Sequence, residues 1–332
     1  MKKIITIALI AMLAVTGVFA SGSSESSADD GVIKVALLLS GPANDQGWNA
    51  IAVAGLKDAE EKFGIEKSIM ENLGIADTEA AYRDYASQGY DLIIGHGYQF
   101  GSPAAKVSKD FPDQYFMATE SASQSDNMAS YVTSCNEGAY IMGMIAGYMT
   151  KSNIVGVEGA MVQPSITKEL EAFKLAVKEV NPSCEVLSVY INTYTDVTKG
   201  KEAAISMIDQ GADVLYHVAN QAGTGLIKAS EEANVLCLGN SYDQNSISPD
   251  YVISSTVYDI PNVIVKAIEN VQNKTFSGGI FNLGMSENIV QIAPYHSFED
   301  TLPQEVKDAV AKRIAEIKDG SFVVPTIESP TK

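Results

Sequence analysis

The sequence predicts an α/β protein of two lobes, each a mostly parallel β-sheet flanked by helices. The chain has 332 residues, which is long enough for two domains with separate cores. Short apolar runs of strand length alternate with helical stretches, as they do in βαβ units. Because this alternation starts again near residues 150–153, we expect two lobes that meet there.

The first series of elements begins with an apolar run over residues 32–40. Its β-branched residues and the turn that closes it favour a strand. Apolar side chains near helical spacing then predict a helix over 49–64. The series continues with strands over 91–98 and 114–120, a helix over 102–112, and a segment, 129–136, that leads into an apolar, glycine-containing helix over 137–150. A helix that is apolar on several sides needs several neighbours.

The second series has expected strands over 153–161, 185–194, 213–220 and 235–241, and expected helices over 166–182, 197–211 and 223–234. Buried-type strands joined through helices form parallel sheets with right-handed crossovers. The rest of the chain is too short to form a third lobe. We therefore expect one lobe from 32–152 plus about 254–275, the other from 153–253 plus about 276–328, and a hinge of three crossing segments.

The N-terminus reads as a targeting segment. Lys2 and Lys3 precede a short apolar stretch and a small-residue cleavage site, which predicts a signal peptide over 1–20 and a Ser-rich tether over 21–31. The alternative is an uncleaved anchor, but the apolar run is short for a membrane span. We expect an exported protein, periplasmic or on the cell surface. No cysteine stands at the cleavage site, so a lipid anchor is not expected.

The net charge of the chain limits the classes of molecule that it can bind. The formal net charge of -18 repels phosphate backbones and anionic lipid, which argues against nucleic acid as a partner.

The chain has three cysteines, an odd number. Cys135, Cys184 and Cys237 show no metal-ligand spacing. One pair could form a disulfide, but small buried apolar residues are the favoured interpretation.

Polar and aromatic residues gather where the predicted strands end. Ligands of parallel sheets bind beyond the carboxyl ends of the strands, and two lobes that face each other there would form a cleft. The chain's one tryptophan lies in such a loop, so we interpret it as a platform for a flat ring. The candidate ligand-binding residues are Asn44, Asp45, Trp48, Tyr98, Phe100, Glu120, Met161, Tyr194, Asn220, Gln221 and Asp243.

Catalytic motifs are missing from the sequence. There is no GxSxG, no HExxH, no GxxxxGK[ST] and no GxGxxG after a strand. His96, His217 and His296 stand alone; a structural role is favoured for the first two, and a surface position is expected for His296. We therefore expect a protein that is not an enzyme and that carries no cofactor and no metal.

Several stretches follow one another in the order of a known family: "GPANDQGWN", "GYQFGSPAAKVSKDFPDQYF", "NEGAYIMGMIAG", "ELEAFKLAVKEVNP", "MIDQGADVLY" and "GNSYDQNSISPDYVISS". Over nearly the whole mature chain the sequence resembles the basic membrane protein (BMP/Med) family. These are purine nucleoside-binding, substrate-binding proteins of ABC importers with a type I periplasmic-binding fold. The resemblance implies a hinged receptor that closes on a purine base or nucleoside and delivers it to a membrane permease.

The resemblance also assigns residues. It implies that Asn44, Asp45 and Trp48 contact the base from the first loop. The other matching positions are Tyr98 and Phe100 in a second aromatic loop, Glu120, Asn220, Gln221 and Asp243. In the family that this sequence resembles, members that bind nucleosides have an acid where Ser241 stands and a lysine where Tyr258 stands. The resemblance implies that these two groups contact the ribose. Their replacement shifts the expectation toward a free purine or another flat heterocycle.

Two alternatives stay open at this point. The closed form of the same receptor could be presented to a membrane signalling protein, which would make the chain a sensor component. The flat ligand could also be a flavin instead of a purine. In each case we expect a monomer that binds a small molecule.

Overall fold

The computed structural model describes residues 31–331. The predicted signal peptide (1–20) and the predicted tether (21–31), except for its last residue, lie outside this range. Within the described range, the longest apolar helices fall short of what a membrane crossing requires. From Ile33 onward the chain forms one compact unit that contains two six-stranded sheets.

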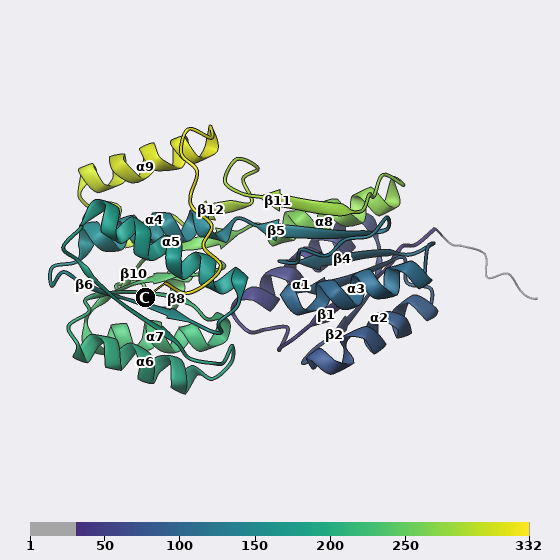
Figure 1. The fold of residues 1–332 in the computed structure, drawn as a ribbon, viewed down its shortest axis with the longest axis horizontal. Helices are drawn as coiled ribbons and strands as arrows, with labels where there is room; N and C mark the ends of the chain where they lie inside the picture. The colour runs from purple at the N-terminus through teal and green to yellow at the C-terminus, as the bar shows by residue number, and fades with distance from the viewer. Residues whose placement is uncertain (1–30, 332) are drawn as a thin grey trace, which may run out of the picture. The chain divides into compact units, whose positions relative to one another are not determined.

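The first sheet has the strand order β11-β5-β4-β3-β1-β2, and all its neighbours pair in parallel (Figure 1). Its strands are β1 (Lys34–Leu39), β2 (Glu66–Met70), β3 (Leu92–His96), β4 (Tyr115–Thr119), β5 (Met128–Thr133) and β11 (Gly279–Leu283). Its helices are α1 (Trp48–Phe63) and α8 (Ile260–Gln272), which pack together, and α2 (Thr78–Ser87) and α3 (Gly101–Val107), which also pack together.

Strand β1 shows why helices cover both faces of this sheet. Successive side chains of a strand point to opposite faces. Leu37 and Leu39 belong to the same buried cluster as residues of α1 and α8. Ala36 and Leu38 belong to another cluster, with residues of α2 and α3. Since both sets are fully buried, β1 reads as one continuous apolar run, as expected for a strand covered on both faces.

The second sheet has the strand order β12-β10-β9-β8-β6-β7, and only the β10–β12 pair is antiparallel. Its strands are β6 (Ile154–Gly159), β7 (Glu185–Tyr190), β8 (Val214–Val218), β9 (Leu236–Gly239), β10 (Val252–Tyr258) and β12 (Val290–Ile292). Its helices are α4 (Cys135–Met149), α5 (Pro164–Val180), α6 (Val197–Asp209), α7 (Asn220–Ala233) and α9 (Gln304–Lys318). Short 3₁₀ turns lie at Ile75–Asp77, Tyr98–Phe100, Ser108–Asp110, Asn245–Ile247 and His296–Phe298.

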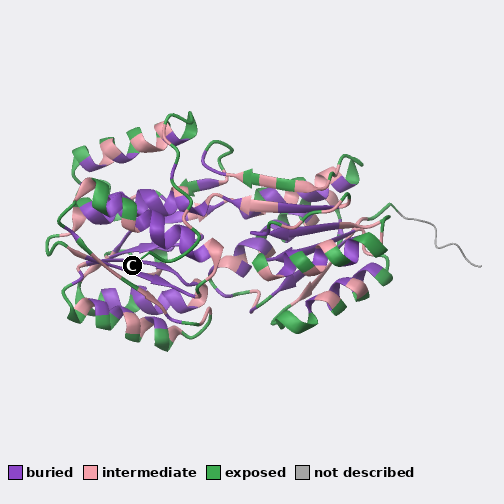
Figure 2. Cartoon of the chain, in the orientation of Figure 1, coloured by how far each residue is buried: buried purple, intermediate pink, exposed green. Residues whose placement is uncertain are grey.

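Helices cover both faces of the second sheet as well. Helices α4 and α5 pack together on one face, α6 and α7 pack together on the other, and α9 contacts α4 (Figure 1). Figure 2 shows the strands of both sheets largely buried, while the outer surfaces of the helices are exposed. The predicted fold class, two mostly parallel sheets flanked by helices, is confirmed.

The chain passes between the two sheets three times, between β5 and α4, between β10 and α8, and between β11 and β12. The boundaries of the lobes differ from the predicted ones. The first segment was expected to extend to residue 152, but α4 packs on α5 and β10 of the second lobe. Most of strand β10 was expected in the first lobe, but β10 pairs in the second sheet. Strand β11 was expected in the second lobe, but it pairs with β5 of the first sheet. An apolar helix packs, and an edge strand pairs, where the rest of the fold offers a complementary surface. The local sequence does not show which lobe offers that surface.

The three cysteines are free thiols and all are buried. This agrees with the interpretation of Cys135, Cys184 and Cys237 as small buried residues. In the part of the chain that the structure describes, no cluster of His, Cys, Asp and Glu has the arrangement of a metal site.

Candidate functional site

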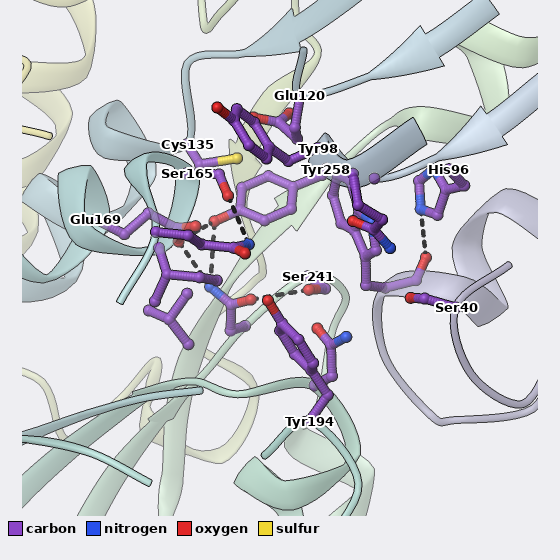
Figure 3. A pocket seen from close by; sticks show the side chains of 18 residues that line it. Ser40, His96, Tyr98, Glu120, Cys135, Ser165, Glu169, Tyr194, Ser241 and Tyr258 are labelled. Carbon is purple, nitrogen blue, oxygen red and sulfur yellow. Dashed lines mark hydrogen bonds between the residues drawn. The ribbon is translucent and has the colours of Figure 1, made fainter. Parts of the chain in front are cut away.

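A pocket lies where the carboxyl ends of strands from both sheets meet the first turns of helices α1, α4, α5 and α7 (Figure 3). Its empty space, counted together with the part that opens to solvent, is about 580 Å³. This is the edge at which parallel sheets commonly bind ligands. The residues that line it are Ser40, Trp48, His96, Gly97, Tyr98, Gln99, Glu120, Cys135, Gln163, Ser165, Ile166, Glu169, Tyr194, Val218, Asn220, Asn240, Ser241 and Tyr258.

The first lobe contributes a stacked pair of rings to the pocket. The rings of Trp48 and His96 have centroids 4.3 Å apart and planes inclined by 17°. His96 Nε2 lies 2.8 Å from the carbonyl oxygen of Trp48, and His96 Nδ1 lies 3.1 Å from Thr119 Oγ1. Burial lowers the pKa of His96 to about 3, so the ring is neutral at physiological pH. A neutral imidazole, fixed by these two hydrogen bonds, therefore lies against one face of the indole.

The second lobe contributes a polar wall built around Glu169 (Figure 3). Glu169 Oε2 accepts hydrogen bonds from Tyr258 Oη at 2.6 Å and from Asn240 Nδ2 at 3.0 Å. The Tyr258 ring also meets the indole of Trp48 edge-on, with centroids 6.2 Å apart. Burial raises the pKa of Glu169 to about 7. Aromatic and carboxylate groups therefore approach each other across the pocket from different lobes.

A buried ion pair lies beside this wall and joins the two lobes. Glu120 follows strand β4, and its Oε2 lies 3.3 Å from Lys168 Nζ of helix α5. Lys168 Nζ also donates to the carbonyl oxygen of Thr133 at 2.7 Å, while Glu120 Oε1 accepts from the Thr133 N–H at 2.8 Å. Both charged side chains are 6% exposed, so removing either partner would leave an uncompensated buried charge.

The backbone is unusual at three positions of the pocket. Glu120, Asn220 and Ser241 have φ values of 55°, 47° and 75°, in the left-handed region that non-glycine residues seldom adopt. Such conformations cost free energy and concentrate at functional sites. Of the eleven non-glycine residues with positive φ in the described range, these three line the pocket, which is consistent with its assignment as the functional site.

The structure brings five of the eleven predicted residues to this pocket: Trp48, Tyr98, Glu120, Tyr194 and Asn220. They come from both lobes and follow different strands. Tyr194 is partly buried, and burial raises its pKa to about 12. Ser241 and Tyr258, the two departures from the family pattern, also line the pocket.

Three first-lobe candidates lie elsewhere. Asn44 is exposed in the loop that precedes α1. The Asp45 carboxylate is buried and accepts from the backbone N–H groups of Gly47, Asn49 and Ala50, so it caps the start of α1 instead of lining the pocket. Phe100 is fully buried in the cluster between the first sheet and helices α2 and α3, because its short turn directs the ring inward.

Three second-lobe candidates also lie outside the pocket lining. Met161 packs against a small buried cluster formed by Ala160 and its neighbours. Gln221 belongs to the first turn of α7, where its carbonyl oxygen accepts from Thr224 Oγ1. Asp243 Oδ2 lies 2.6 Å from His296 Nε2 at the surface. His296 was expected at the surface, and its side chain is 36% exposed.

The most informative residue that strand-end reasoning missed is Glu169. It lies in the second turn of α5 and not at a strand end. A signal was present, since Glu169 is three residues after Ile166 and four before Phe173, on the face that buries both. A carboxylate on the apolar face of a helix needs a partner. Helical periodicity could therefore have marked it as a candidate.

Comparisons with known proteins agree with this architecture. The family model described as ABC transporter substrate-binding protein PnrA-like (Bmp) matches residues 32–325. A purine-binding protein of Brucella abortus is 28% identical, over 87% of this chain and 82% of its own. The ABC transporter nucleoside-binding protein BmpA of Lactococcus lactis is 26% identical, over 98% of this chain and 99% of its own.

A solved structure is similar along most of the chain. A solute-binding protein of an ABC transporter system from Aeropyrum pernix superposes with a TM-score of 0.82 at 24% identity, over 89% of this chain and 94% of its own. It supports the fold alone, while the family match extends across both lobes and the pocket. The chain therefore belongs to the Bmp family of PnrA-like ABC transporter substrate-binding proteins.

Proposed function

We propose that this protein acts outside the cytoplasm, where it binds a purine-type ligand, a free base or a nucleoside, and delivers it to the permease of an ABC importer. The observation that carries the proposal is the Trp48–His96 stack, which offers an oriented aromatic platform to a pocket whose other wall is polar. Flat heterocycles need both features, a ring to stack on and groups that bond to their edge. The printed names of the Brucella and Lactococcus relatives favour the same ligand class.

The energetics of such a pocket are adequate for a transport receptor. Aromatic stacking, apolar burial and a few hydrogen bonds to buried groups can together reach about 8 kcal/mol, which corresponds to micromolar affinity. The Trp48 indole is stacked on His96 before the ligand arrives, so little side-chain freedom is lost on binding.

We infer a preference for the free base, or equal binding of base and nucleoside. Ser241 and Tyr258 stand where the family pattern has charged groups. The Tyr258 hydroxyl donates to Glu169 at 2.6 Å, and the Ser241 hydroxyl donates to Asn240 Oδ1 at 2.8 Å. Because both hydroxyl protons are engaged within the protein, neither hydroxyl is free to donate a hydrogen bond to a sugar.

Binding would close the two lobes on the ligand. The chain passes three times between the sheets, and pocket residues come from both. A ligand that contacts more surface in the closed state stabilises that state by its differential affinity. We expect the receptor to act as a monomer whose closed form is read by the permease.

A thermal-shift panel of purine bases, nucleosides, riboflavin and sugars tests the ligand class. A ligand that binds only the folded state raises the melting temperature, and adenine or guanine should do so at least as strongly as its nucleoside. In calorimetry, Trp48→Ala should weaken the binding of the best purine about tenfold or more, because it removes the stacking platform.

The matched control is Tyr148→Ala, an exposed aromatic at the end of α4 that does not line the pocket. Its affinity should equal that of the wild type. A flavin or sugar as the only stabilising ligand would contradict the proposed ligand class. Unchanged affinity in Trp48→Ala would remove Trp48 from the site, and a nucleoside preference of tenfold or more would contradict the reading of Ser241 and Tyr258.

A further inference from the structure

Glu169 has one carboxylate oxygen that the protein does not use. The residue is 4% exposed and lines the pocket. Its Oε2 accepts from Tyr258 Oη at 2.6 Å, Asn240 Nδ2 at 3.0 Å and Tyr216 Oη at 3.4 Å. No hydrogen bond from the residues that the structure describes reaches Oε1. Because Glu169 lines the pocket and its Oε1 has no partner among the described residues, this acceptor is open to a group that enters the pocket.

The hydrogen bonds and the charge around Glu169 stabilise its ionised form, and burial opposes them. Two hydrogen-bond donors, the Tyr258 hydroxyl and the Asn240 amide, point at the same oxygen within 3.0 Å. The adjacent Lys168 adds a positive charge that is also bound to Glu120. Donors and a cation stabilise the carboxylate form. The free Oε1 is therefore suited to accept a hydrogen bond from a ligand.

We propose that Glu169 is a specificity-determining residue, and that its Oε1 accepts a hydrogen bond from an N–H group on the edge of the bound heterocycle. This inference rests on the proposed function, because it assigns the polar edge of the ligand whose flat face contacts Trp48. It selects purines that present an N–H donor in the ring plane and disfavours those that present only acceptors or a methyl group there.

Proton linkage follows from this assignment. Burial raises the pKa of Glu169 to about 7 in the ligand-free protein. A ligand N–H favours the ionised form and lowers that pKa, so binding releases a proton. Affinity is then highest above pH 7 and falls as the pH drops below 7. It should be about tenfold lower at pH 6 than at pH 8, since roughly a tenth of Glu169 is ionised at pH 6.

Several other ionisable groups lie around Glu169. Burial raises the pKa of Tyr216, Tyr258 and Cys135 well above their ordinary values. Burial opposes the charge of Lys168, but the carboxylates of Glu120 and Glu169 raise its pKa above the ordinary value. Glu120 is ion-paired with Lys168. The pKa of His96, on the opposite wall, is lowered by burial to about 3.

The first experiment uses calorimetry on the wild-type protein with guanine or adenine, whichever the panel shows to bind, between pH 6 and pH 8. Two buffers with different protonation enthalpies measure the proton released. We expect weaker binding at pH 6 and net proton release near pH 7. A flat profile, or tighter binding at low pH, would overturn the inference, and this measurement needs no variant.

Variants identify the group responsible. Glu169→Gln should weaken binding at pH 8 and remove the pH slope, while its fold is checked by circular dichroism. The control is Glu158→Gln, another fully buried carboxylate of the second lobe that does not line the pocket. It should keep the wild-type binding profile. Retention of the slope in Glu169→Gln would assign the proton to another group and overturn the inference.

A set of N-methylated bases gives an independent readout. One methylation should cost the wild type about tenfold or more and cost Glu169→Ala much less, because the lost bond is the one to Oε1. Equal penalties in both proteins for every methylated base would overturn the inference. If the wild type binds no base or nucleoside at all, the proposed function fails and takes this inference with it; binding with a flat pH profile defeats the inference alone.

Discussion

At the scale of single residues, the second lobe holds a buried carboxylate that the pocket does not use. Glu158 lies on β6, is 0% exposed, and neither oxygen has a hydrogen-bond partner in the described structure. It stands beside His217 of β8 in register, and His217 Nδ1 also lacks a partner there. His217 Nε2 lies 2.8 Å from Gln244 Oε1, and burial lowers the pKa of His217 to about 4. Both histidines favoured as structural are fully buried and hydrogen-bonded.

Because Glu158 is buried, we expect the free energy of unfolding of the protein to depend on pH. Burial raises its pKa well above the ordinary value of 4.5, so the folded protein keeps a proton that the unfolded chain releases. The stability it contributes is complete below pH 4.5 and is lost as the pH rises toward the folded-state pKa, by up to about 1.4 kcal/mol per pH unit. Chemical unfolding of Glu158→Gln between pH 5 and pH 8 should show a flatter pH dependence than the wild type.

The surface substitution Glu231→Gln serves as the control and should leave the pH dependence unchanged. Identical slopes for Glu158→Gln and the wild type would show that Glu158 is ionised in the folded protein. That outcome would imply an internal water or another partner for its oxygens.

The candidate site was predictable where it follows strand ends. Glu120 and Asn220 follow strands β4 and β8 closely, and Trp48 ends the loop that follows β1. The geometry of parallel sheets brings such positions together. Phe100 does not line the pocket, because one turn of 3₁₀ helix directs its ring into the core. Glu169 was missed because its place depends on which face of α5 lies against the pocket, a tertiary property.

At the scale of elements, α4 illustrates how close packing depends on glycine. Twelve of its fifteen residues are buried, and it packs tightly on α5. A Cβ atom on Gly143 would lie 2.4 Å from the carbonyl oxygen of Phe173 and 2.8 Å from Ala176 Cβ. The helices can approach this closely only because the side chain is absent.

Gly143→Ala should therefore destabilise the protein. The added methyl overlaps backbone atoms of α5, and overpacking of this kind typically costs about 1–3 kcal/mol. Urea unfolding should show a lower midpoint with a similar slope. The control is Ser102→Ala, an exposed position of α3, which should change stability by less than about 0.5 kcal/mol. A neutral effect of Gly143→Ala would mean that α4 and α5 can separate without loss.

Most elements were predictable from hydrophobic pattern, and the exceptions have a physical cause. The apolar runs of β1, β3 and β8 are fully or nearly fully buried, so burial leaves a continuous signal in the sequence. Strand β2 at the sheet edge is only half-buried and mostly polar, and no element was predicted there. Helix α2 places Tyr82 and Tyr85 inward among polar residues, which weakens its pattern.

At the scale of the whole molecule, the lobes approach each other beside the pocket at Gly47 and Asn220. A Cβ atom on Gly47 would lie 3.2 Å from the Asn220 Cα atom. Gly47 immediately precedes α1 of the first lobe, and Asn220 begins α7 of the second. A side chain at position 47 would thus hold the lobes apart without disturbing either core.

Gly47→Val should weaken ligand affinity about tenfold or more, since the lobes would no longer reach the ligand together. X-ray scattering should show a smaller radius of gyration for the wild type with ligand than without it, and a reduced change for the variant. Gly47→Ala is the graded control, because its single methyl requires a shift of only a few tenths of an ångström. Wild-type affinity and compaction in Gly47→Val would contradict closure at this contact.

The division of the chain between lobes was the least predictable property. Helix α4 and strands β10 and β11 join the lobe that offers a complementary surface, and that choice depends on contacts far away in sequence. The number of crossings followed from length, but their positions did not.

The stacking of Trp48 on His96 has a practical consequence. Because the chain contains one tryptophan, its intrinsic fluorescence comes from an indole that borders the pocket. Emission excited at the red edge of the absorption band would report occupancy of that cavity directly, without a dye and without signal from elsewhere in the chain. The molecule carries its own optical probe at the place where a guest would be held.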